Sequence, residues 1–158
     1  MVLSVGEVNK NKNHKVGIEA LAKLNDKGTY YVICGCGPLM ETHKELSRRL
    51  GISDRVILAG YRTDIADFYK MANVFLFPSF REGLPVAVME AMASGLPVIA
   101  TRIRGSSDLV QKDALVEPTD VEKIAYRMRE DLSCPNIREM KEYDISYVVK
   151  QVKRIYGI

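Results

Sequence analysis

The chain has 158 residues, of which 47% are apolar and 27% are charged, a composition typical of one soluble globular domain. Its net charge of +3 and its lack of a compact Lys and Arg run argue against nucleic-acid binding. No apolar stretch approaches the ~20 residues that a transmembrane helix needs. We expect a cytoplasmic protein whose contact with a membrane is at most peripheral.

Short apolar runs alternate with amphipathic segments along the chain, a pattern typical of a parallel sheet with crossover helices. In chain order the pattern predicts strand 2–5, helix 14–27, strand 30–34, helix 39–50, strand 55–59, helix 65–71, strand 74–77, helix 85–94, strand 98–101, strand 114–116, and helices 121–132 and 145–156. The predicted fold class is α/β, with a doubly wound, mostly parallel, Rossmann-like sheet of six strands. All of residues 1–158 are assigned to one domain.

The predicted strand order, 3-2-1-4-5-6, is common in doubly wound sheets and makes the first and fourth strands neighbours. The loops that follow them, 6–13 and 78–85, then leave from the same edge of the sheet. Ligands bind at this edge in such folds. We expect the two loops to face each other and to form the functional site.

The cysteines and histidines point to neither a disulfide nor a metal. Cys34 lies in an apolar run and Cys36 lies between two glycines, which favours reduced, structural thiols, and a third cysteine is Cys134. His14 and His43 have no metal-ligand spacing to these cysteines. We expect no bound metal.

The segment 78–100 carries the strongest chemical signal. A buried strand leads into a turn in which Gly83 lets the backbone approach a ligand closely. A helix then begins near Pro85, and its first amides are unpaired donors at the positive end of the helix dipole. This arrangement binds phosphate.

Two carboxylates accompany this helix start. Glu90 lies in an otherwise apolar helix, so we expect both helix faces to be covered and its carboxylate to need partners. Two interpretations stay open for Glu90: sugar hydroxyls donate to it, or it lies on a solvated edge or caps a neighbouring loop. For Glu82, the residues alone favour a solvated loop position.

From Ser79 onward the segment resembles the Glu-x7-Glu signature of retaining glycosyltransferases with the GT-B fold, family 4 or group 1. The two glutamates match Glu82 and Glu90, and the E-G-L-P, E-A-M-A and G-x-P-V-I elements are in register. The resemblance implies that Glu82 contacts hydroxyls of the donor sugar and that Glu90 contacts the ribose. The backbone amides that it implies for the diphosphate are those near Gly83, Leu84 and Val86.

The loop after the first strand resembles the family's G-R-L-x3-K-G stretch, whose Arg and Lys bind the pyrophosphate. Gly6 and Lys12 match this stretch, but Glu7 stands at the arginine position. One phosphate-binding charge is therefore missing from the loop. Lys10 and Arg81 are candidates to replace it.

Three further turns resemble the family. The turn 35–39 resembles G-x-G-P-L, and we interpret it as conformational because the third glycine of a dinucleotide fingerprint is absent. The turn 60–64 resembles G-x-R-x-D, where Arg62 either contacts base or phosphate or is simply exposed. The segment 101–110 resembles T-x-x-G-G-x-x-[ED], but Arg104 replaces one glycine and no role is assigned there.

The resemblance covers residues 2–119 and implies the C-terminal half of a GT-B enzyme, whereas 120–158 match only as generic helices. An N-terminal acceptor domain is expected to be absent from this chain, which alone should be inactive. The implied substrate is a nucleotide-diphospho-sugar, with UDP-sugars the commonest case, and no cofactor or metal is expected. The acceptor, a glycan or lipid-linked glycan, would bind to the missing domain.

The implied reaction transfers a hexose-type sugar to an acceptor hydroxyl with retention, in polysaccharide or glycan biosynthesis. Lys12 would stabilise the charge that grows on the leaving diphosphate, and Glu82 would position the sugar. Two other classes stay open: a GT-B nucleotide-sugar 2-epimerase-like enzyme, and a Rossmann nucleotide- or NAD-binding module. The context of Glu82 favours transfer, and the incomplete glycine pattern argues against a dinucleotide.

Overall fold

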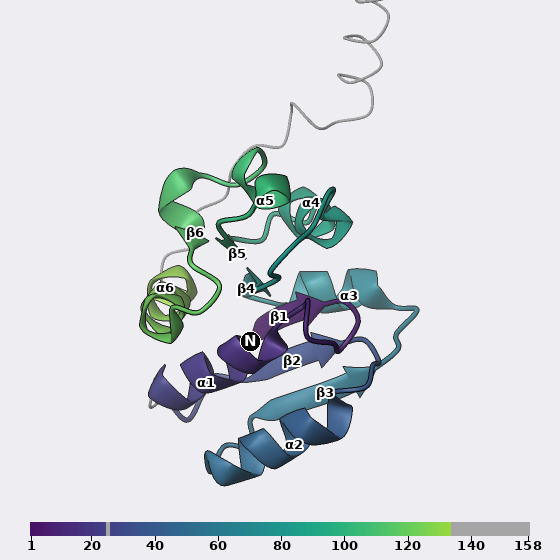
Figure 1. The fold of residues 1–158 in the computed structure, drawn as a ribbon, viewed down its shortest axis with the longest axis vertical. Coiled ribbons are helices and arrows are strands. Elements are labelled where there is room, and N and C mark those ends of the chain that lie inside the picture. Colours follow the sequence, from purple (N-terminus) through teal and green to yellow (C-terminus); the bar gives the residue numbers. More distant parts are fainter. Residues whose placement is uncertain (25, 134–158) are drawn as a thin grey trace, which may run out of the picture.

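A computed structural model describes residues 1–24 and 26–133 of the protein. Its strands form one sheet in which every pair is parallel, in the order β3-β2-β1-β4-β5-β6 (Figure 1). The strands are β1 (Val2–Val5), β2 (Tyr31–Cys34), β3 (Val56–Gly60), β4 (Val74–Phe77), β5 (Val98–Thr101) and β6 (Leu115–Val116). The predicted fold class and strand order are confirmed.

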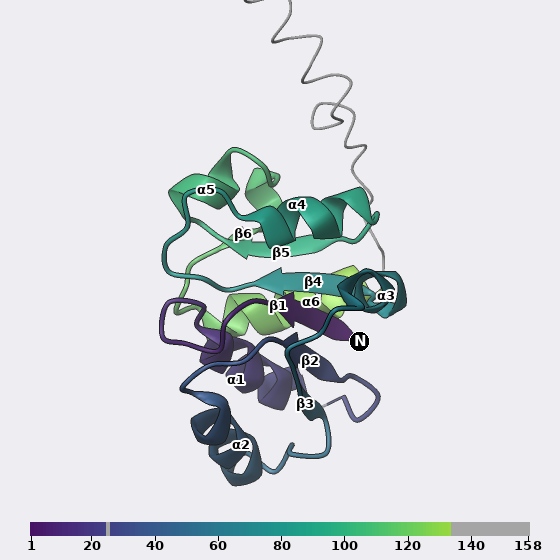
Figure 2. The same ribbon diagram turned by 90° about the vertical axis from the view of Figure 1, so that its right-hand side faces the viewer.

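Helices cover both faces of this sheet, as Figures 1 and 2 show. Helices α1, α2 and α6 pack on one face and α3 and α4 on the other, with α5 beside α4. The helices are α1 (His14–Leu24), α2 (Met40–Arg49), α3 (Ile65–Met71), α4 (Val86–Ala93), α5 (Arg104–Ser107), the 3-10 turn η1 (Lys112–Ala114) and α6 (Val121–Ser133). The short helices α5 and η1 were not predicted, because three or four residues are too few to show an apolar period.

Helix α1 ends at Leu24, three residues before the predicted end at Lys27. The side chain of Asp26 provides the reason, because its carboxylate accepts hydrogen bonds from the Gly28 amide at 2.9 Å and from the Thr29 hydroxyl. Such a turn offers the backbone an alternative to a further helical turn. The predicted helix 145–156 lies outside the described residues.

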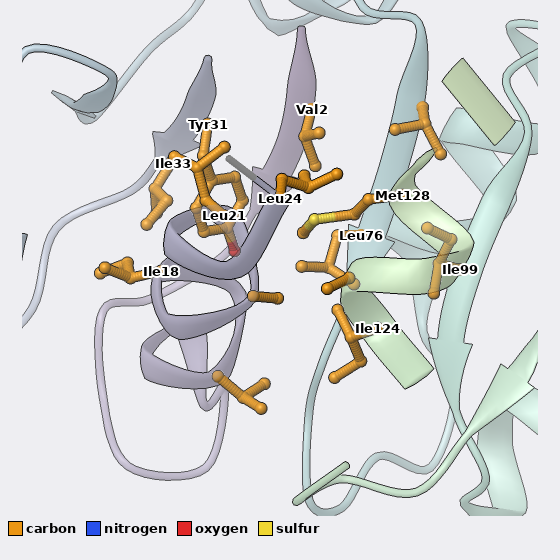
Figure 3. Packing of buried hydrophobic residues seen from close by; sticks show 14 of the residues in the cluster. Val2, Ile18, Leu21, Leu24, Tyr31, Ile33, Leu76, Ile99, Ile124 and Met128 are labelled. Atoms are coloured by element: carbon orange, nitrogen blue, oxygen red, sulfur yellow. The ribbon is translucent and has the colours of Figure 1, made fainter. Parts of the chain in front are cut away.

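The core consists of two layers, because a parallel sheet is buried on both faces. Along β1, Val2 belongs to the layer under α1 and α6, whereas Leu3 belongs to the layer under α3 and α4. Figure 3 shows Leu21 and Leu24 of α1 facing Met128 of α6 across the first layer. Full burial of such side chains contributes about 1.5–3 kcal/mol each.

A buried polar network lies below the loop that follows β1. The Ser4 hydroxyl donates to the carbonyl of Leu76, so the Tyr31 hydroxyl donates to Ser4 Oγ, at 2.8 Å. His14, which is 1% exposed, has Nδ1 3.5 Å from the Tyr31 hydroxyl, and its Nε2 is buried without a partner. Burial, with smaller contributions from His43 and Lys12, lowers the pKa of His14 to about 3.

The pKa of His14 predicts that the protein loses stability in mild acid. The unfolded chain takes up a proton near the ordinary histidine pKa of about 6.5, whereas the folded chain resists protonation down to about 3. Between these values the unfolded state binds more protons, so the free energy of unfolding falls as the pH falls. At pH 5 this loss amounts to ~2 kcal/mol.

Urea unfolding of the wild type and His14→Gln at pH 7.5 and pH 5 measures this contribution. We expect the wild type to lose about 2 kcal/mol more than the variant over this interval. Equal losses in the two proteins would show that His14 is not the responsible group.

Candidate functional site

Two loops leave the same edge of the sheet: the β1 loop, residues 6–13, and the β4 loop, residues 78–85 (Figure 2). The Phe80 amide donates to the Asn11 carbonyl at 2.8 Å. The Asn11 side-chain amide donates to the Arg81 carbonyl at 2.9 Å. The structure therefore brings the two loops into direct contact, as predicted from the strand order.

The centre of this contact is an ion pair between Lys12 and Glu82. The Lys12 Nζ atom lies 2.7 Å from Glu82 Oε1, and the two side chains are only 21% and 19% exposed. The same ammonium lies 5.3 Å from the centre of the Phe77 ring. At Gly6 a Cβ atom would lie 3.1 Å from Lys12 Cε, so glycine leaves room for the lysine chain.

Both members of the pair keep hydrogen-bonding capacity. An ammonium group has three hydrogen-bond donors. Among the described residues, Glu82 is the only one whose side chain accepts from the Lys12 ammonium. Glu82 Oε1 also lies 3.3 Å from the Asn11 side-chain amide, whereas Glu82 Oε2 accepts no hydrogen bond from residues 1–24 or 26–133. The pair can therefore offer cationic donors to an anion and a carboxylate oxygen to a hydroxyl.

The start of α4 lies open beside this pair, with Leu84 66% and Val86 54% exposed. Pro85 has φ −83° and ψ 80°, and the Val86 amide donates to the Leu84 carbonyl at 3.0 Å. This inverse γ-turn occupies the Val86 amide, which differs from the expectation for that residue. Within the described part of the chain, the amides of Gly83, Leu84 and Ala87 donate no hydrogen bond.

Glu90 lies on an exposed edge of α4, so the expectation that both faces of this helix are covered is wrong. The helix buries only the side that packs on the sheet, through Val88, Ala91 and Met92. Glu90 Oε2 accepts a hydrogen bond from the Tyr69 hydroxyl of α3 at 2.9 Å. Burial and this carboxylate raise the pKa of Tyr69, so its hydroxyl stays protonated as the donor.

Arg62 is exposed and is paired within its own turn. Its Nε lies 2.9 Å from Asp64 Oδ1, and its guanidinium lies 5.2 Å from the centre of the Phe68 ring. No hydrogen bond or ion pair in the described residues joins it to Lys12 or Glu82. Its contact with a ligand therefore remains a prediction.

Glycines set how closely the segments of the site approach. At Gly35 a Cβ atom would lie 1.9 Å from the Gly6 carbonyl oxygen, which confirms the conformational interpretation of that turn. Sequence reasoning missed Gly105, where a Cβ atom would lie 2.7 Å from the Glu82 carbonyl oxygen and 2.8 Å from that of Gly83. The only sequence feature that pointed to Gly105 is that it matches one glycine of the Gly-Gly pair in the T-x-x-G-G-x-x-[ED] stretch. Asn11 and Tyr69 were missed as well, because nothing local marks their distant partners.

A cavity of about 640 Å³ opens at Glu82, and we name it the Glu82 cavity. Its walls come from both loops and from the start of α5. The lining residues are Asn11, Phe80, Arg81, Glu82, Gly83, Ile103 and Arg104.

Residues 1–24 and 26–133 contain no group of three or more His, Cys, Asp or Glu side chains that could hold a metal ion. No helix in this part of the chain has the length and apolar character to cross a bilayer. Cys34 and Cys36 are free thiols, and Cys134 lies outside the described residues. Burial raises the pKa of Cys34 to about 11, which keeps it an unreactive thiol.

The strand order, with β1 beside β4, defines a doubly wound, Rossmann-like domain with its ligand edge at the two loops. Residues 1–145 match the family described as Glycosyl transferases group 1. The chain belongs to this family.

Relatives that are named as glycosyltransferases agree with this assignment. The chain is 36% identical over 96 residues to the UDP-Gal:alpha-D-GlcNAc-diphosphoundecaprenol alpha-1,3-galactosyltransferase of Escherichia coli, covering 58% of this chain and 25% of that protein. It is 34% identical over 105 residues to the lipopolysaccharide core biosynthesis glycosyltransferase LpsE of Rhizobium meliloti, covering 66% and 30%. The chain thus spans about a third or less of these relatives.

The crystal structure of Anabaena Alr3699/HepE in complex with UDP and glucose superposes with a TM-score of 0.82 at 21% identity, over 99% of this chain and 48% of that one. At this identity the likeness shows the fold, which is that of GT-B glycosyltransferases.

Proposed function

We propose that this chain is the nucleotide-sugar-binding domain of a retaining glycosyltransferase whose acceptor domain lies outside it. The observation that carries the proposal is the Lys12–Glu82 pair beside the open start of α4. These groups offer together a cation, unpaired amides and a free carboxylate oxygen. A sugar diphosphate presents the matching set of anionic oxygens and hydroxyls.

The residues of the site take separate roles in this proposal. The leaving group is a nucleoside diphosphate, so negative charge grows on its oxygens in the transition state. Lys12 and the unpaired amides at the start of α4 stabilise that charge, and such prearranged donors usually contribute most to catalysis. Glu82 holds the sugar through Oε2, Glu90 accepts from the ribose, and Arg62 contacts the base.

The proposed donor is a UDP-hexose, and the proposed acceptor is a glycan or lipid-linked glycan. The relative from Escherichia coli is named for UDP-Gal and a diphosphoundecaprenol-linked sugar, and the similar Anabaena structure holds UDP and glucose. The proposed place of action is the cytoplasm, at the inner face of the cell membrane for a lipid-linked acceptor.

A thermal-shift comparison of UDP, GDP, ADP and NAD tests the proposal on this chain. A ligand at 100 times its Kd stabilises the native state by about 2.7 kcal/mol, which raises the Tm by roughly 5–10 °C. We expect UDP to produce the largest shift and NAD none. A shift with NAD alone would refute the proposal.

Glu82→Gln separates recognition of the sugar from recognition of the nucleotide. We expect UDP-glucose to bind the wild type more tightly than UDP does, and the variant to lose this difference while it still binds UDP. Glu19→Gln, a change of the same kind at a partly exposed position on α1, should keep the difference. If both variants keep it, Glu82 does not hold the sugar.

A further inference from the structure

The charges around the Glu82 cavity do not balance. Three charged side chains line it, namely Arg81, Glu82 and Arg104. Lys12 already neutralises Glu82 at 2.7 Å, so this pair contributes no net charge. In the part of the chain that the structure describes, neither Arg81 nor Arg104 donates a side-chain hydrogen bond or forms an ion pair. Two guanidinium groups at this cavity are therefore uncompensated.

The backbones of both arginines are held in place although their guanidinium groups are uncommitted. The Arg81 carbonyl accepts from the Asn11 side chain at 2.9 Å. Arg104 begins α5 next to Gly105, which has no room for a side chain against the β4 loop. A Cβ atom at Gly105 would also lie 3.1 Å from Pro85 Cδ, so α5 starts directly against the start of α4.

We propose that Arg104, assisted by Arg81, binds the diphosphate of the nucleotide sugar in the Glu82 cavity. This inference rests on the proposed function and adds an anion-binding subsite to it. The neutral Lys12–Glu82 pair attracts a multiply charged anion weakly at a distance, because its two charges cancel. A guanidinium offers a planar fork of donors that fits two phosphate oxygens at once. Arg104 and Gly83 line the same cavity, and the Gly83 amide, which donates to none of the described residues, can hold the same phosphates.

Calorimetric titration of the 158-residue chain with UDP and with uridine tests this subsite. We expect Arg104→Gln to weaken UDP binding about tenfold, the effect of one charge-assisted hydrogen bond, and to leave uridine binding unchanged. Arg104→Lys should recover only part of the loss, because an ammonium cannot form the fork. The matched control is Arg102→Gln, since Arg102 carries the same charge nearby but pairs with Glu117 at 3.1 Å and does not line the cavity.

The outcomes separate this inference from the proposed function. If the wild type binds none of UDP, GDP and ADP, the proposed function itself fails. If the wild type binds UDP and Arg104→Gln affects it no more than Arg102→Gln does, the subsite is wrong and the proposed function stands. A loss that appears equally with uridine also overturns it, since it indicates a general disturbance of the site and not the loss of a contact with the diphosphate.

Discussion

Replacing Lys12 with methionine is expected to weaken UDP binding roughly 10- to 100-fold, the effect of losing a hydrogen bond from a charged donor. The ammonium lies between Glu82 and the Phe77 ring and is mostly shielded from solvent. Methionine fills a similar volume but leaves the Glu82 carboxylate without its cation, and this carboxylate then repels a diphosphate. Calorimetric titration of UDP into both proteins measures the loss.

Lys15→Met is the matched control for this prediction. Lys15 lies on α1, three residues farther along, where it is 61% exposed and faces Glu19 at 3.5 Å. We expect its UDP affinity to stay within about twofold of the wild type, as for surface pairs that contribute little. Equal affinities in the Lys12 and Lys15 variants would remove Lys12 from the site.

Alanine at Gly35 is expected to lower the free energy of unfolding by about 3 kcal/mol or more. Gly35 has φ +151°, a conformation that side chains disfavour, and its Cβ atom would lie 1.9 Å from the Gly6 carbonyl oxygen. Relief of this overlap has to move the β1 loop, which carries Lys12. The Tm should fall by roughly 6–12 °C, and UDP affinity should fall with it.

Gly28→Ala is the matched control, because it tests whether alanine at any loop glycine lowers the free energy of unfolding as much as alanine at Gly35 does. Gly28 lies outside the left-handed region, and the nearest atom to its Cβ position is the Asp26 side-chain oxygen at 3.4 Å, so alanine fits there. We expect the control to change stability by at most about 0.5 kcal/mol. Similar Tm values for the two variants would mean that the contact between Gly35 and the β1 loop carries no strain.

Much of the fold followed from local patterns in the sequence. Apolar runs of three to five residues predicted the strands, and the apolar period of segments such as α1 and α6 predicted the helices that cover the sheet. The errors have local causes too. The turn at Asp26 shortened α1, and α5 was too short to show a period. Because the residues of α4 are apolar on every side, the sequence led to the wrong expectation that both faces of this helix are covered.

The features of the site also fall into two groups, those that the sequence predicted and those that only the tertiary structure decided. The sequence by itself determined that the β1 and β4 loops leave one edge of the sheet, because parallel strands of this order align their carboxyl ends. It also predicted Lys12 and Glu82 for that edge and Glu90 for the helix that follows, through their resemblance to a family signature. Only the tertiary structure decided that Lys12 pairs with Glu82, that Tyr69 donates to Glu90, and that the Val86 amide is occupied. Periodicity indicates which side of an element is buried. The partner of a polar group, in contrast, lies on a segment that can be 70 or more residues away and that it meets only in the fold.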